Sequence, residues 1–321
     1  MNASKNGNQR TIAWNQAELV WDGDGLPTKL LLTFCRLLPH FRGKGRLFQW
    51  LAAHCFHGEL LLHNGLGARL KIDPADYIGR TIAFDGNFEP KSVALALEIM
   101  KDGGVFLDVG CNFGLYTLCV GMLPGVECIA IDGSFVALSK FAANLNRNRG
   151  INARLVECAL GAESGLVCFE LADAQNLGST RIADNADKAQ RRGFWAAAVT
   201  LQSVLERLAP EQVKLLKIDV EGSEMVVFNG LDLDGYYRPQ NLIVECYAEI
   251  FPQAKKVFEF LISKGYEAMT VDGRSVADCT DLPEQNVWFR SVRNPSSEQQ
   301  PLSAGIGRAA HAGYGVDLPC R

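Results

Sequence analysis

Two carboxylates and a turn with two glycines have the spacing of a nucleotide-binding site. The segment VFLDVGCNFG, at residues 105–114, predicts a strand that carries Asp108 and then runs into a turn. In ECIAIDG, Asp132 ends the next predicted strand. An open parallel sheet binds ligands in the crevice beyond the carboxyl ends of its strands, where the strand order reverses. We therefore expect Asp108 and Asp132 to lie at one ligand site.

The residues of this turn have distinct expected roles. Gly110 lets the backbone approach a ligand closely, and Gly114 lets the following helix begin tightly against the strand. The Asp132 carboxylate can accept hydrogen bonds from both hydroxyls of a ribose, as the acidic residue of nucleotide-binding folds does. The spacing D-x-G-x-N-x-G adds Asn112. The predicted cofactor-binding residues are Asp108, Gly110, Asn112, Gly114 and Asp132.

The position of Asp108 favours one class of cofactor over another. A dinucleotide carries a pyrophosphate, which binds bare backbone N–H groups at a helix N-terminus and is repelled by carboxylates. The turn also lacks the G-x-G-x-x-G sequence of dinucleotide sites. An acidic group suits a ligand with an ammonium and a sulfonium, so the pattern favours S-adenosylmethionine over NAD. An aspartate that only caps the turn is the alternative.

A second group of carboxylates lies at the ends of two later strands. Asp219 ends the predicted strand KLLKID, Glu221 follows it, and Glu245 lies near the end of NLIVEC. Adjacent strands would bring all three to one rim. Methyl transfer to an alcohol is an in-line displacement, in which positioning contributes up to about 7–11 kcal/mol and a general base about 10²–10⁴-fold. We expect Asp219 to orient donor or acceptor, with Glu221 or Glu245 as the catalytic base.

These carboxylates also have structural interpretations. Glu221 could cap the helix that begins near Ser223, and Glu245 could pair with a cation such as Lys217. Three carboxylates could also hold Mg²⁺, which prefers oxygen ligands and would polarise an acceptor hydroxyl. The sequence leaves Mg²⁺ open without requiring it, and we assign no residue as a metal ligand.

From about residue 92, predicted strands alternate with predicted helices, which indicates a largely parallel sheet covered on both faces. The seven predicted strands are VFLDV (105–109), ECIAI (127–131), ARLVECA (153–159), KLLKID (214–219), NLIVEC (241–246), EAMTVD and NVWFR. Ser134 is the expected N-cap of the helix that follows the second strand. GLVCFELA (165–172) predicts an extra strand before a long polar loop. The expected fold is α/β, with a Rossmann-like, mostly parallel sheet.

The segments outside this region differ in character. Residues 1–28 are polar and predict a flexible arm, and residues 291–321 are rich in Ser, Gln, Gly and Pro and predict a disordered tail. Residues 29–91 predict two short helices and then a strand or hairpin in ARLKIDPADYIGRTIAFDGNFEP. The main domain is expected at 92–290.

The two short predicted helices, in KLLLTFCRLLPHF and GRLFQWLAAHCF, carry apolar faces and a few cations. We expect them to pack on the main domain, and docking on a membrane surface is the alternative. His54 and His57 lie one helical turn apart beside Cys55 and could suggest zinc. Because no second ligand pair lies near them in the sequence, a packed or exposed helix is favoured.

Composition narrows the classes of protein. A formal net charge of −4 and a pI near 5.8 give no basic field, so a nucleic-acid partner is not expected. The ten cysteines lack C-x-x-C spacing, and several lie among apolar neighbours, which indicates reduced core residues of a cytoplasmic protein. The polar N-terminus lacks the apolar region of a signal peptide, and no apolar run reaches the roughly 18 residues that a membrane span needs.

Several blocks of the sequence together resemble one known family. VFLDVGCNFGLYT, VTLQSVLERL, KLLKIDVEGSEMVVFNG and LIVECY are similar to the FkbM family of S-adenosylmethionine-dependent methyltransferases, and KIDVEGSE is the most specific of these blocks. IGRTIAFDGNFEP resembles the strand and turn that precede the domain in that family. Family members usually carry Glu-Pro where this chain has Asp132-Gly133, and Ala where it has Cys111.

The resemblance implies a fold and an activity. It implies a class I methyltransferase sheet of seven strands with the last one antiparallel, and methyl transfer to hydroxyl groups of sugars, glycans or polyketide-like natural products. It also implies a polar loop near the substrate, with Asn176, Gly178, Ser179 and Thr180. The expected partner is a small-molecule or glycan acceptor. A non-catalytic nucleotide-cleft module in a glycan-biosynthesis assembly is the alternative function.

Overall fold

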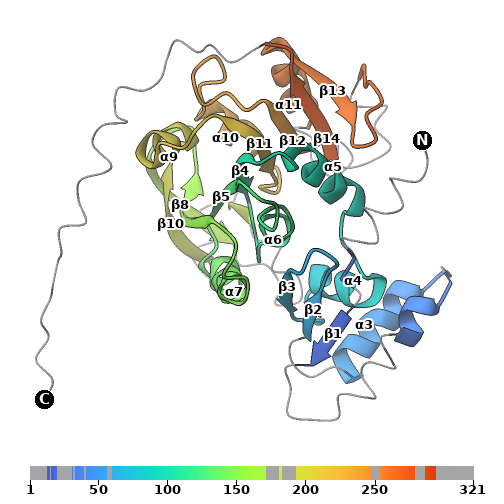
Figure 1. Cartoon of the computed structure of the whole chain (residues 1–321). Coiled ribbons are helices and arrows are strands. Elements are labelled where there is room, and N and C mark those ends of the chain that lie inside the picture. The colour runs from blue at the N-terminus through green and yellow to red at the C-terminus, as the bar shows by residue number, and fades with distance from the viewer. Residues whose placement is uncertain are drawn as a thin grey trace, which may run out of the picture.

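The computed structural model describes residues 13–14, 16–19, 31, 33–39, 41–55, 60–170, 181–182, 193–246, 254–278 and 286–293. Its centre is a seven-stranded sheet with the order β13-β14-β12-β11-β4-β5-β6 (Figure 1). The strands are β4 (Gly104–Val109), β5 (Val126–Asp132), β6 (Ala153–Glu157), β11 (Val213–Ile218), β12 (Asn241–Glu245), β13 (Tyr266–Thr270) and β14 (Asn286–Ser291). Neighbours are parallel except around β14, which is antiparallel to both β12 and β13. The predicted fold class is confirmed.

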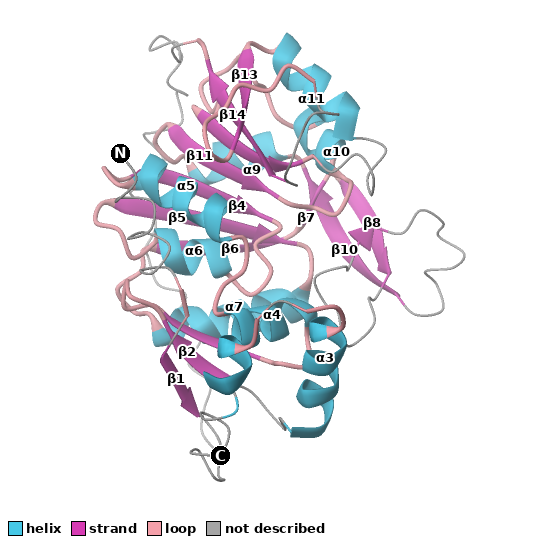
Figure 2. Cartoon of the chain, turned by 90° about the vertical axis from the view of Figure 1, so that its right-hand side faces the viewer, coloured by secondary structure: helices cyan, strands magenta, loops and turns pink. Residues whose placement is uncertain are grey.

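Helices cover both faces of this sheet, because successive residues of the central strands alternate between two apolar clusters. Leu215 packs in the cluster with α5 (Pro90–Met100), α6 (Leu115–Val120) and α7 (Phe135–Arg147). Leu216 packs in the cluster with α9 (Leu201–Leu208), α10 (Glu224–Asn229) and α11 (Ala254–Ser263). Figure 2 shows α5 and α6 on one side of the sheet and α10 and α11 on the other. Such burial on both faces requires the nearly continuous apolar strands seen in the sequence.

All seven predicted strands are present, within a residue or two of the expected ends. The third predicted strand divides at Cys158 into β6 and β7 (Ala159–Leu160). The extra predicted strand is β8 (Gly165–Glu170), and it belongs to a second, four-stranded sheet with the order β7-β10-β8-β9. Its other members are β9 (Arg181–Ile182) and β10 (Gly193–Val199). Ser134 caps α7 as predicted, with its hydroxyl accepting from the Ala137 N–H.

The N-terminal part forms a three-stranded antiparallel sheet of β1 (Gln16–Leu19), β2 (Leu60–His63) and β3 (Arg69–Ile72), beside helices α3 (Lys44–Cys55) and α4 (Tyr77–Asp85). The predicted continuation of the strand or hairpin through residues 77–85 is wrong, because this segment is α4. The Asp76 side chain caps its first turn by accepting from the Gly79 N–H, and Gly86 ends it with a left-handed φ of 82°. Among the described residues, no helix has the length and apolar character needed to cross a bilayer.

Asn144 of α7 and Asn148, the C-cap of this helix, fix the N-terminal sheet to the main sheet. Asn144 Oδ1 accepts from the Lys71 N–H and Asn148 Oδ1 from the Arg69 N–H, both at 2.8 Å. Their amide nitrogens donate back to the carbonyls of the same two residues of β3. Asn144 also donates to the Phe113 carbonyl, at 3.3 Å. The side chains therefore satisfy backbone groups along β3 that would otherwise lack partners.

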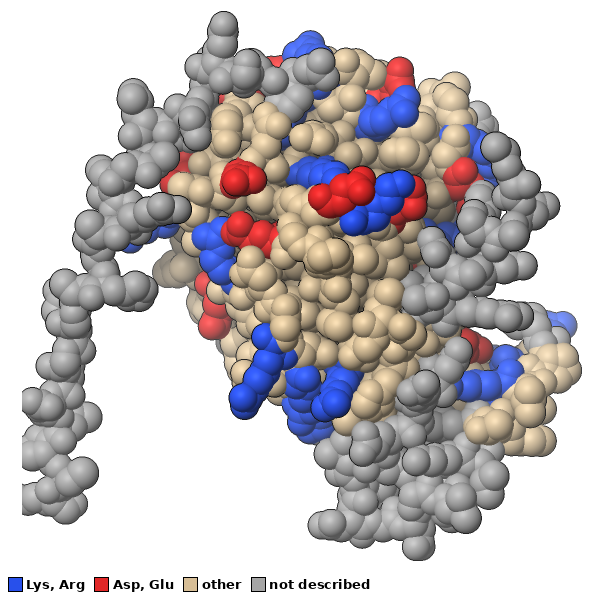
Figure 3. Space-filling view, viewed as in Figure 1, with Lys and Arg blue, Asp and Glu red and all other residues tan. Residues whose placement is uncertain are grey.

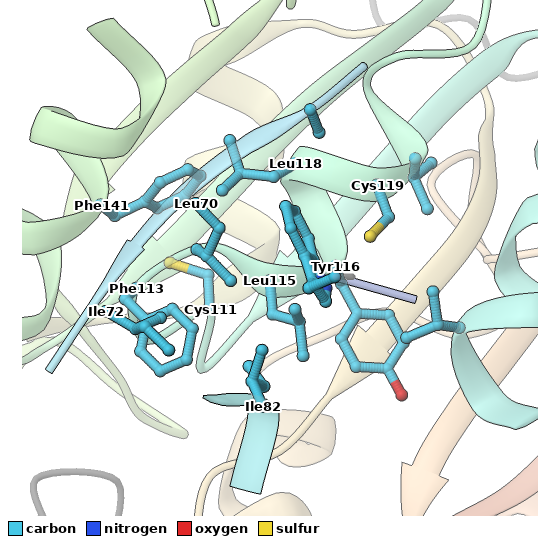
Figure 4. Packing of buried hydrophobic residues seen from close by; sticks show 14 of the residues in the cluster. Leu70, Ile72, Ile82, Cys111, Phe113, Leu115, Tyr116, Leu118, Cys119 and Phe141 are labelled. Atoms are coloured by element: carbon cyan, nitrogen blue, oxygen red, sulfur yellow. The ribbon is translucent and has the colours of Figure 1, made fainter. Parts of the chain in front are cut away.

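Apolar packing reinforces this junction. Figure 4 shows Leu70 and Ile72 of β3 beside Phe113, Leu115 and Phe141, within one buried cluster. The turn that follows β4 is thus held between the N-terminal sheet and α7. Several predicted features lie outside the described residues: most of the arm 1–28, most of the tail 291–321, His57, and the loop residues Asn176, Gly178, Ser179 and Thr180.

Candidate functional site

The turn after β4 lies where the strand order reverses, between β4 and its neighbours β11 and β5. Gly110 has a φ of 74°, and a Cβ at this position would lie 1.7 Å from the Asp219 carbonyl oxygen. The Asp219 N–H donates to the Val109 carbonyl at 3.0 Å. The glycine is therefore required by the close approach of the ends of β4 and β11. The expected close approach of Gly110 to a ligand stays a prediction.

Gly114 is required by a contact between helices. It precedes α6 with a φ of 89°, and a Cβ there would lie 2.2 Å from the ring of Phe141 in α7. The tight contact of the start of α6 with α7 is thus a reason for glycine beyond the expected tight start of the helix against the strand. Both glycines thus shape the turn from the protein side.

Asp132 joins the turn after β4 to the end of β5. Its Oδ2 accepts from the Asn112 N–H at 2.9 Å, and its Oδ1 accepts from the Ser134 N–H at 2.8 Å. Asn112 has a left-handed φ of 50°, a conformation that asparagine tolerates better than most residues. Burial raises the pKa of Asp132, while the N–H groups of Ser134 and Asn112 oppose this rise. The two predicted residues Asn112 and Asp132 are therefore in direct contact.

Asp108 has a structural partner in the first turn of α6. Its side chain is buried, and its Oδ2 accepts from the Thr117 hydroxyl at 2.6 Å and from the Thr117 N–H at 3.1 Å. Burial raises the pKa of Asp108 to about 6, and the Thr117 hydroxyl limits that rise. These contacts match the capping alternative that the sequence left open. A direct contact of Asp108 with a donor stays a prediction.

The register of the sheet places a lysine next to Asp108. Lys217 of β11 is paired with Asp108 of β4 on one side and with Ile243 of β12 on the other. Paired residues of neighbouring strands point to the same face, here the face covered by α5 and α6. The Lys217 side chain is 2% exposed, and its Nζ donates to Asp219 Oδ2 at 3.0 Å. The Nζ also lies 5.3 Å from the ring centroid of Tyr116.

Further polar side chains connect this pair to α5 and β14. The Tyr116 hydroxyl donates to Glu89 Oε2 at 2.6 Å, and burial followed by the Glu89 charge holds the pKa of Tyr116 well above its usual value. Asn286 of β14 donates its Nδ2 to the Ser92 hydroxyl at 3.2 Å and is paired with Glu245 of β12. Asn286 Oδ1 is buried and has no hydrogen-bond partner among the described residues.

The charges around Lys217 determine its ionisation and that of Glu245. Burial alone would lower the pKa of Lys217, but the carboxylates of Asp219, Glu89 and Glu245 raise it above its usual value. Burial raises the pKa of Glu245, the Asp219 charge raises it further, and Lys217 opposes the rise. Lys217 is therefore charged at neutral pH, whereas Glu245 retains a proton at a higher pH than an ordinary glutamate.

Two predicted residues, Asp219 and Glu221, lie in the loop after β11, and Glu224, which the sequence analysis did not assign, begins α10. Glu221 adopts a left-handed φ of 53°. The carboxylate that accepts from the loop is instead Glu224, whose Oε1 receives the Val220 N–H at 3.3 Å and the Gly222 N–H at 3.1 Å. Glu224 thus holds the loop before α10, and the capping alternative for Glu221 stays a prediction. A non-glycine residue in this strained conformation is common at ligand sites.

The structure brings most of the predicted residues to one edge of the sheet. Asp219 and Glu245 lie close enough for their charges to interact, and both the Asp219 and Glu221 charges act on Glu245. Across the described parts of the chain, no three His, Cys, Asp or Glu side chains are placed to hold a metal ion. Lys217 interacts electrostatically with Glu245, as the alternative expected, but it forms its ion pair with Asp219.

Sequence reasoning missed Tyr116 and Glu89 as members of this site, and it named Lys217 only as a possible partner of Glu245. Lys217 did carry a signal: a lysine within an apolar central strand is costly to bury unless a partner compensates its charge. In the sequence, Tyr116 has the surroundings of an ordinary buried aromatic residue. Glu89 lies in a connecting segment whose contacts depend on the fold. Neither could be placed from local pattern alone.

The sequence matches a known protein family and is similar to two curated proteins. A family model described as the Methyltransferase FkbM domain matches residues 108–268, which include the turn after β4, Asp132 and Glu245. The chain is 25% identical over 191 residues to "Methyltransferase sdnD" of Sordaria araneosa, covering 50% of this chain and 73% of that protein. It is 27% identical over 184 residues to "Methyltransferase 1" of Beauveria bassiana (strain ARSEF 2860), covering 51% and 73%.

Among solved structures, the chain is similar to the O-methyltransferase TomG from Streptomyces achromogenes, with a TM-score of 0.40 and 11% identity over 68% of this chain and 87% of that chain. The family match spans half of the sequence and contains the end of β4 together with β5, β11 and β12. The chain belongs to the FkbM methyltransferase family.

Proposed function

We propose that this methyltransferase uses S-adenosylmethionine to methylate a hydroxyl group of a sugar, a glycan or a related natural product. The observation that carries the proposal is the carboxylate cluster of Asp219 and Glu245, which lies at the same sheet edge as the turn after β4 and Asp132. This edge is where an α/β sheet binds its ligands. We place the donor and the acceptor side by side at this edge.

The geometry of Asp132 fits the ribose of the donor. An ionised carboxylate has about four lone-pair sites, two on each oxygen. The N–H groups of Asn112 and Ser134 take one site on each oxygen. Each oxygen can therefore accept one further hydrogen bond, which matches the two ribose hydroxyls. The same N–H groups hold the carboxylate in place before the ligand arrives, which lowers the entropy cost of binding.

The charges fit the methionine end of the donor. S-adenosylmethionine brings an ammonium and a sulfonium, and the site surrounds a single lysine with the carboxyl groups of Asp108, Asp219, Glu89 and Glu245. A site of this sign attracts a cation more strongly than the neutral product that remains after methyl transfer. Product release is favoured by the same difference.

The residues near the acceptor can supply orientation and a base. Lys217 fixes one oxygen of Asp219, so that the aspartate can orient the acceptor hydroxyl with its remaining lone pairs. A carboxylate with a raised pKa is a stronger base, and general-base catalysis is most efficient when that pKa lies near the working pH. We therefore assign the base to Glu245 and keep Glu221 as the second choice. The orphan Asn286 Oδ1 would accept a hydrogen bond from a bound hydroxyl or water.

Calorimetric titration of the full chain tests the donor. Heat of binding is expected with S-adenosylmethionine and, more weakly, with S-adenosylhomocysteine, whereas NAD should give none. A folded sample that shows no heat with millimolar S-adenosylmethionine, or that binds NAD instead, would rule out the proposed cofactor. Circular dichroism of the same sample establishes that it is folded.

A further inference from the structure

The segment from Gly25 to Gly58 differs in charge from the rest of this acidic chain. It contains no Asp or Glu, although the chain as a whole has a formal net charge of −4. Its cations are Lys29, Arg36, Arg42, Lys44 and Arg46. Most of the segment is described, as a helical stretch at residues 33–37 and as α3. A positive region of this kind needs an explanation apart from methyl transfer.

One side of this helix pair is fixed to the protein. Cys35 is buried, and the Arg36 guanidinium donates to the Ala83 carbonyl at 2.9 Å and to the Trp14 carbonyl at 3.0 Å. From α3, Phe48 and Ala52 are buried in the same apolar cluster as α4, and Phe48 stacks on Phe84. The pair therefore has a defined orientation, and the side chains on its opposite side face solvent.

The outward side combines large apolar side chains with cations. Phe34 is 60% exposed and Leu37 78% exposed, one helical turn apart. Trp50 is 55% exposed and lies one turn from Arg46 on the exposed face of α3. Phe41 and Arg42, between the two helices, are also exposed. We call Phe34, Leu37, Phe41, Arg42, Arg46 and Trp50 the α3 surface; the described part of the lobe around α3, at the lower right of Figure 3, includes tan and blue atoms.

The chemistry of the α3 surface identifies its partner. A nucleic acid or a strongly acidic polypeptide would pair with the cations, but it would offer no apolar medium to Leu37 and Phe34. A bilayer interface suits each of these side chains. It offers acyl chains for Leu and Phe, the headgroup level for Trp, and anionic headgroups for Arg. We propose that the α3 surface docks the protein on membranes that contain anionic lipids. This inference goes beyond the proposed methyl transfer and does not depend on it.

Co-sedimentation of the full chain with lipid vesicles tests the proposal. Binding is expected to vesicles in which about a third of the lipid is phosphatidylglycerol and the rest phosphatidylcholine, and to be far weaker with phosphatidylcholine alone. It should fall as salt rises, because screening shortens the range of the arginine charges. Arg42→Glu combined with Arg46→Glu should weaken binding at least about tenfold, since each cation near an anionic surface contributes about fivefold.

A matched pair of tryptophans separates the α3 surface from other exposed apolar groups. Trp195 of β10 is 56% exposed, close to the exposure of Trp50, but lies on the second sheet. Trp50→Ala should weaken vesicle binding several-fold, and Trp195→Ala should leave it unchanged. In the parent protein, lipid with bromine-labelled acyl chains should quench tryptophan fluorescence, and Trp50→Phe should remove most of that quenching.

Three results would overturn the proposal. One is the absence of sedimentation with the anionic vesicles at low salt. Another is equal binding by the parent, the double arginine variant and Trp50→Ala, each shown by circular dichroism to be folded. The third is capture by a soluble poly-glutamate probe without any vesicle binding, which would identify an acidic polypeptide as the partner.

Discussion

The ammonium of Lys217 lies 3.0 Å from Asp219 Oδ2, and this ion pair joins a buried side chain to a partly exposed one. The lysine is 2% exposed, whereas the aspartate is 32% exposed. A fixed charge in the core therefore holds a carboxylate whose other atoms can reach the crevice. Geometry of this kind suits a residue that must present an oxygen to a ligand without moving.

Lys217→Met should destabilise the fold and misorient Asp219. Breaking a buried pair typically costs about 3–5 kcal/mol because a buried charge loses its partner. Because Asp219 can still reach water here, we expect the free energy of unfolding to fall by about 1–3 kcal/mol, as measured by urea unfolding. Lys214→Met is the matched control, because Lys214 lies on the same strand but donates to the Gly103 carbonyl at the opposite end. If the two variants bound S-adenosylmethionine equally well and lost equal stability, Lys217 would have no special role.

Asp132→Ala should weaken binding of S-adenosylmethionine by at least about tenfold. Each charge-assisted hydrogen bond to the ribose contributes about 1.5–3 kcal/mol, and the turn at Asn112 also loses its acceptor. Calorimetry gives the change in Kd. Asp232→Ala provides the control, since Asp232 accepts a similar local hydrogen bond, from the Asp234 N–H, on an exposed loop. Unchanged affinity in Asp132→Ala would remove Asp132 from the donor site.

Asp108→Asn should change the pH dependence of stability in a defined direction. The pKa of Asp108 is about 6 in the fold, above its ordinary value, so the folded state binds the proton more tightly and loses stability as pH rises through 6. Asparagine has no such loss. Relative to the parent, the free energy of unfolding of the variant should therefore rise by about 1 kcal/mol between pH 5 and pH 8, as measured by urea unfolding. A constant difference across this range would contradict the raised pKa.

Gly110→Ala should lower the free energy of unfolding far more than an alanine substitution at an ordinary glycine. A left-handed φ alone costs an alanine about 1–2 kcal/mol. Gly273 has a similar φ of 82°, with nothing within 4 Å of an added Cβ, so Gly273→Ala measures that cost alone. At Gly110 the Cβ also meets the Asp219 backbone, and we expect a loss of more than about 3 kcal/mol. Equal losses in the two variants would show that β4 and β11 do not approach as described.

Glu245→Gln should remove the pH dependence of methyl transfer, once an acceptor is known. A base must be deprotonated, and burial raises the pKa of Glu245, so the parent rate should rise with pH from neutral into the alkaline range. The variant should be slower by about 10²–10⁴-fold and should lack that rise. Glu221→Gln is the comparison. A larger loss in Glu221→Gln, with the pH profile abolished there, would move the base to Glu221.

The main sheet could be predicted because its signals are local. Runs such as ECIAI and NLIVEC are apolar on both faces, and Ser134 follows Asp132 where a helix N-cap belongs. The prediction for residues 77–85 was wrong because the local signals of this segment are ambiguous. Its pattern allows both a strand and a helix, and the choice is made by the Asp76 cap, by Gly86, and by the packing of Ile82 and Phe84 in the tertiary core.

The sequence grouped several residues of the candidate site, but it did not predict the contacts between them. Residues that end parallel strands must meet at one edge, so Asp132, Asp219 and Glu245 could be grouped from sequence. Which carboxylate holds which partner depends on register and side-chain packing. Sequence alone could not show that Thr117 holds Asp108 or that Lys217 holds Asp219.

Transfer of a labelled methyl group tests the central claim most directly. The full chain would be incubated with methyl-labelled S-adenosylmethionine and a panel of glycans, lipids and hydroxyl-bearing natural products, and mass spectrometry would locate the label. We predict a product labelled on oxygen, formed by the parent and lost in Asp132→Ala. A label on nitrogen or carbon would contradict the proposed acceptor. Donor binding without transfer to any member of the panel would instead support a non-catalytic nucleotide-cleft module.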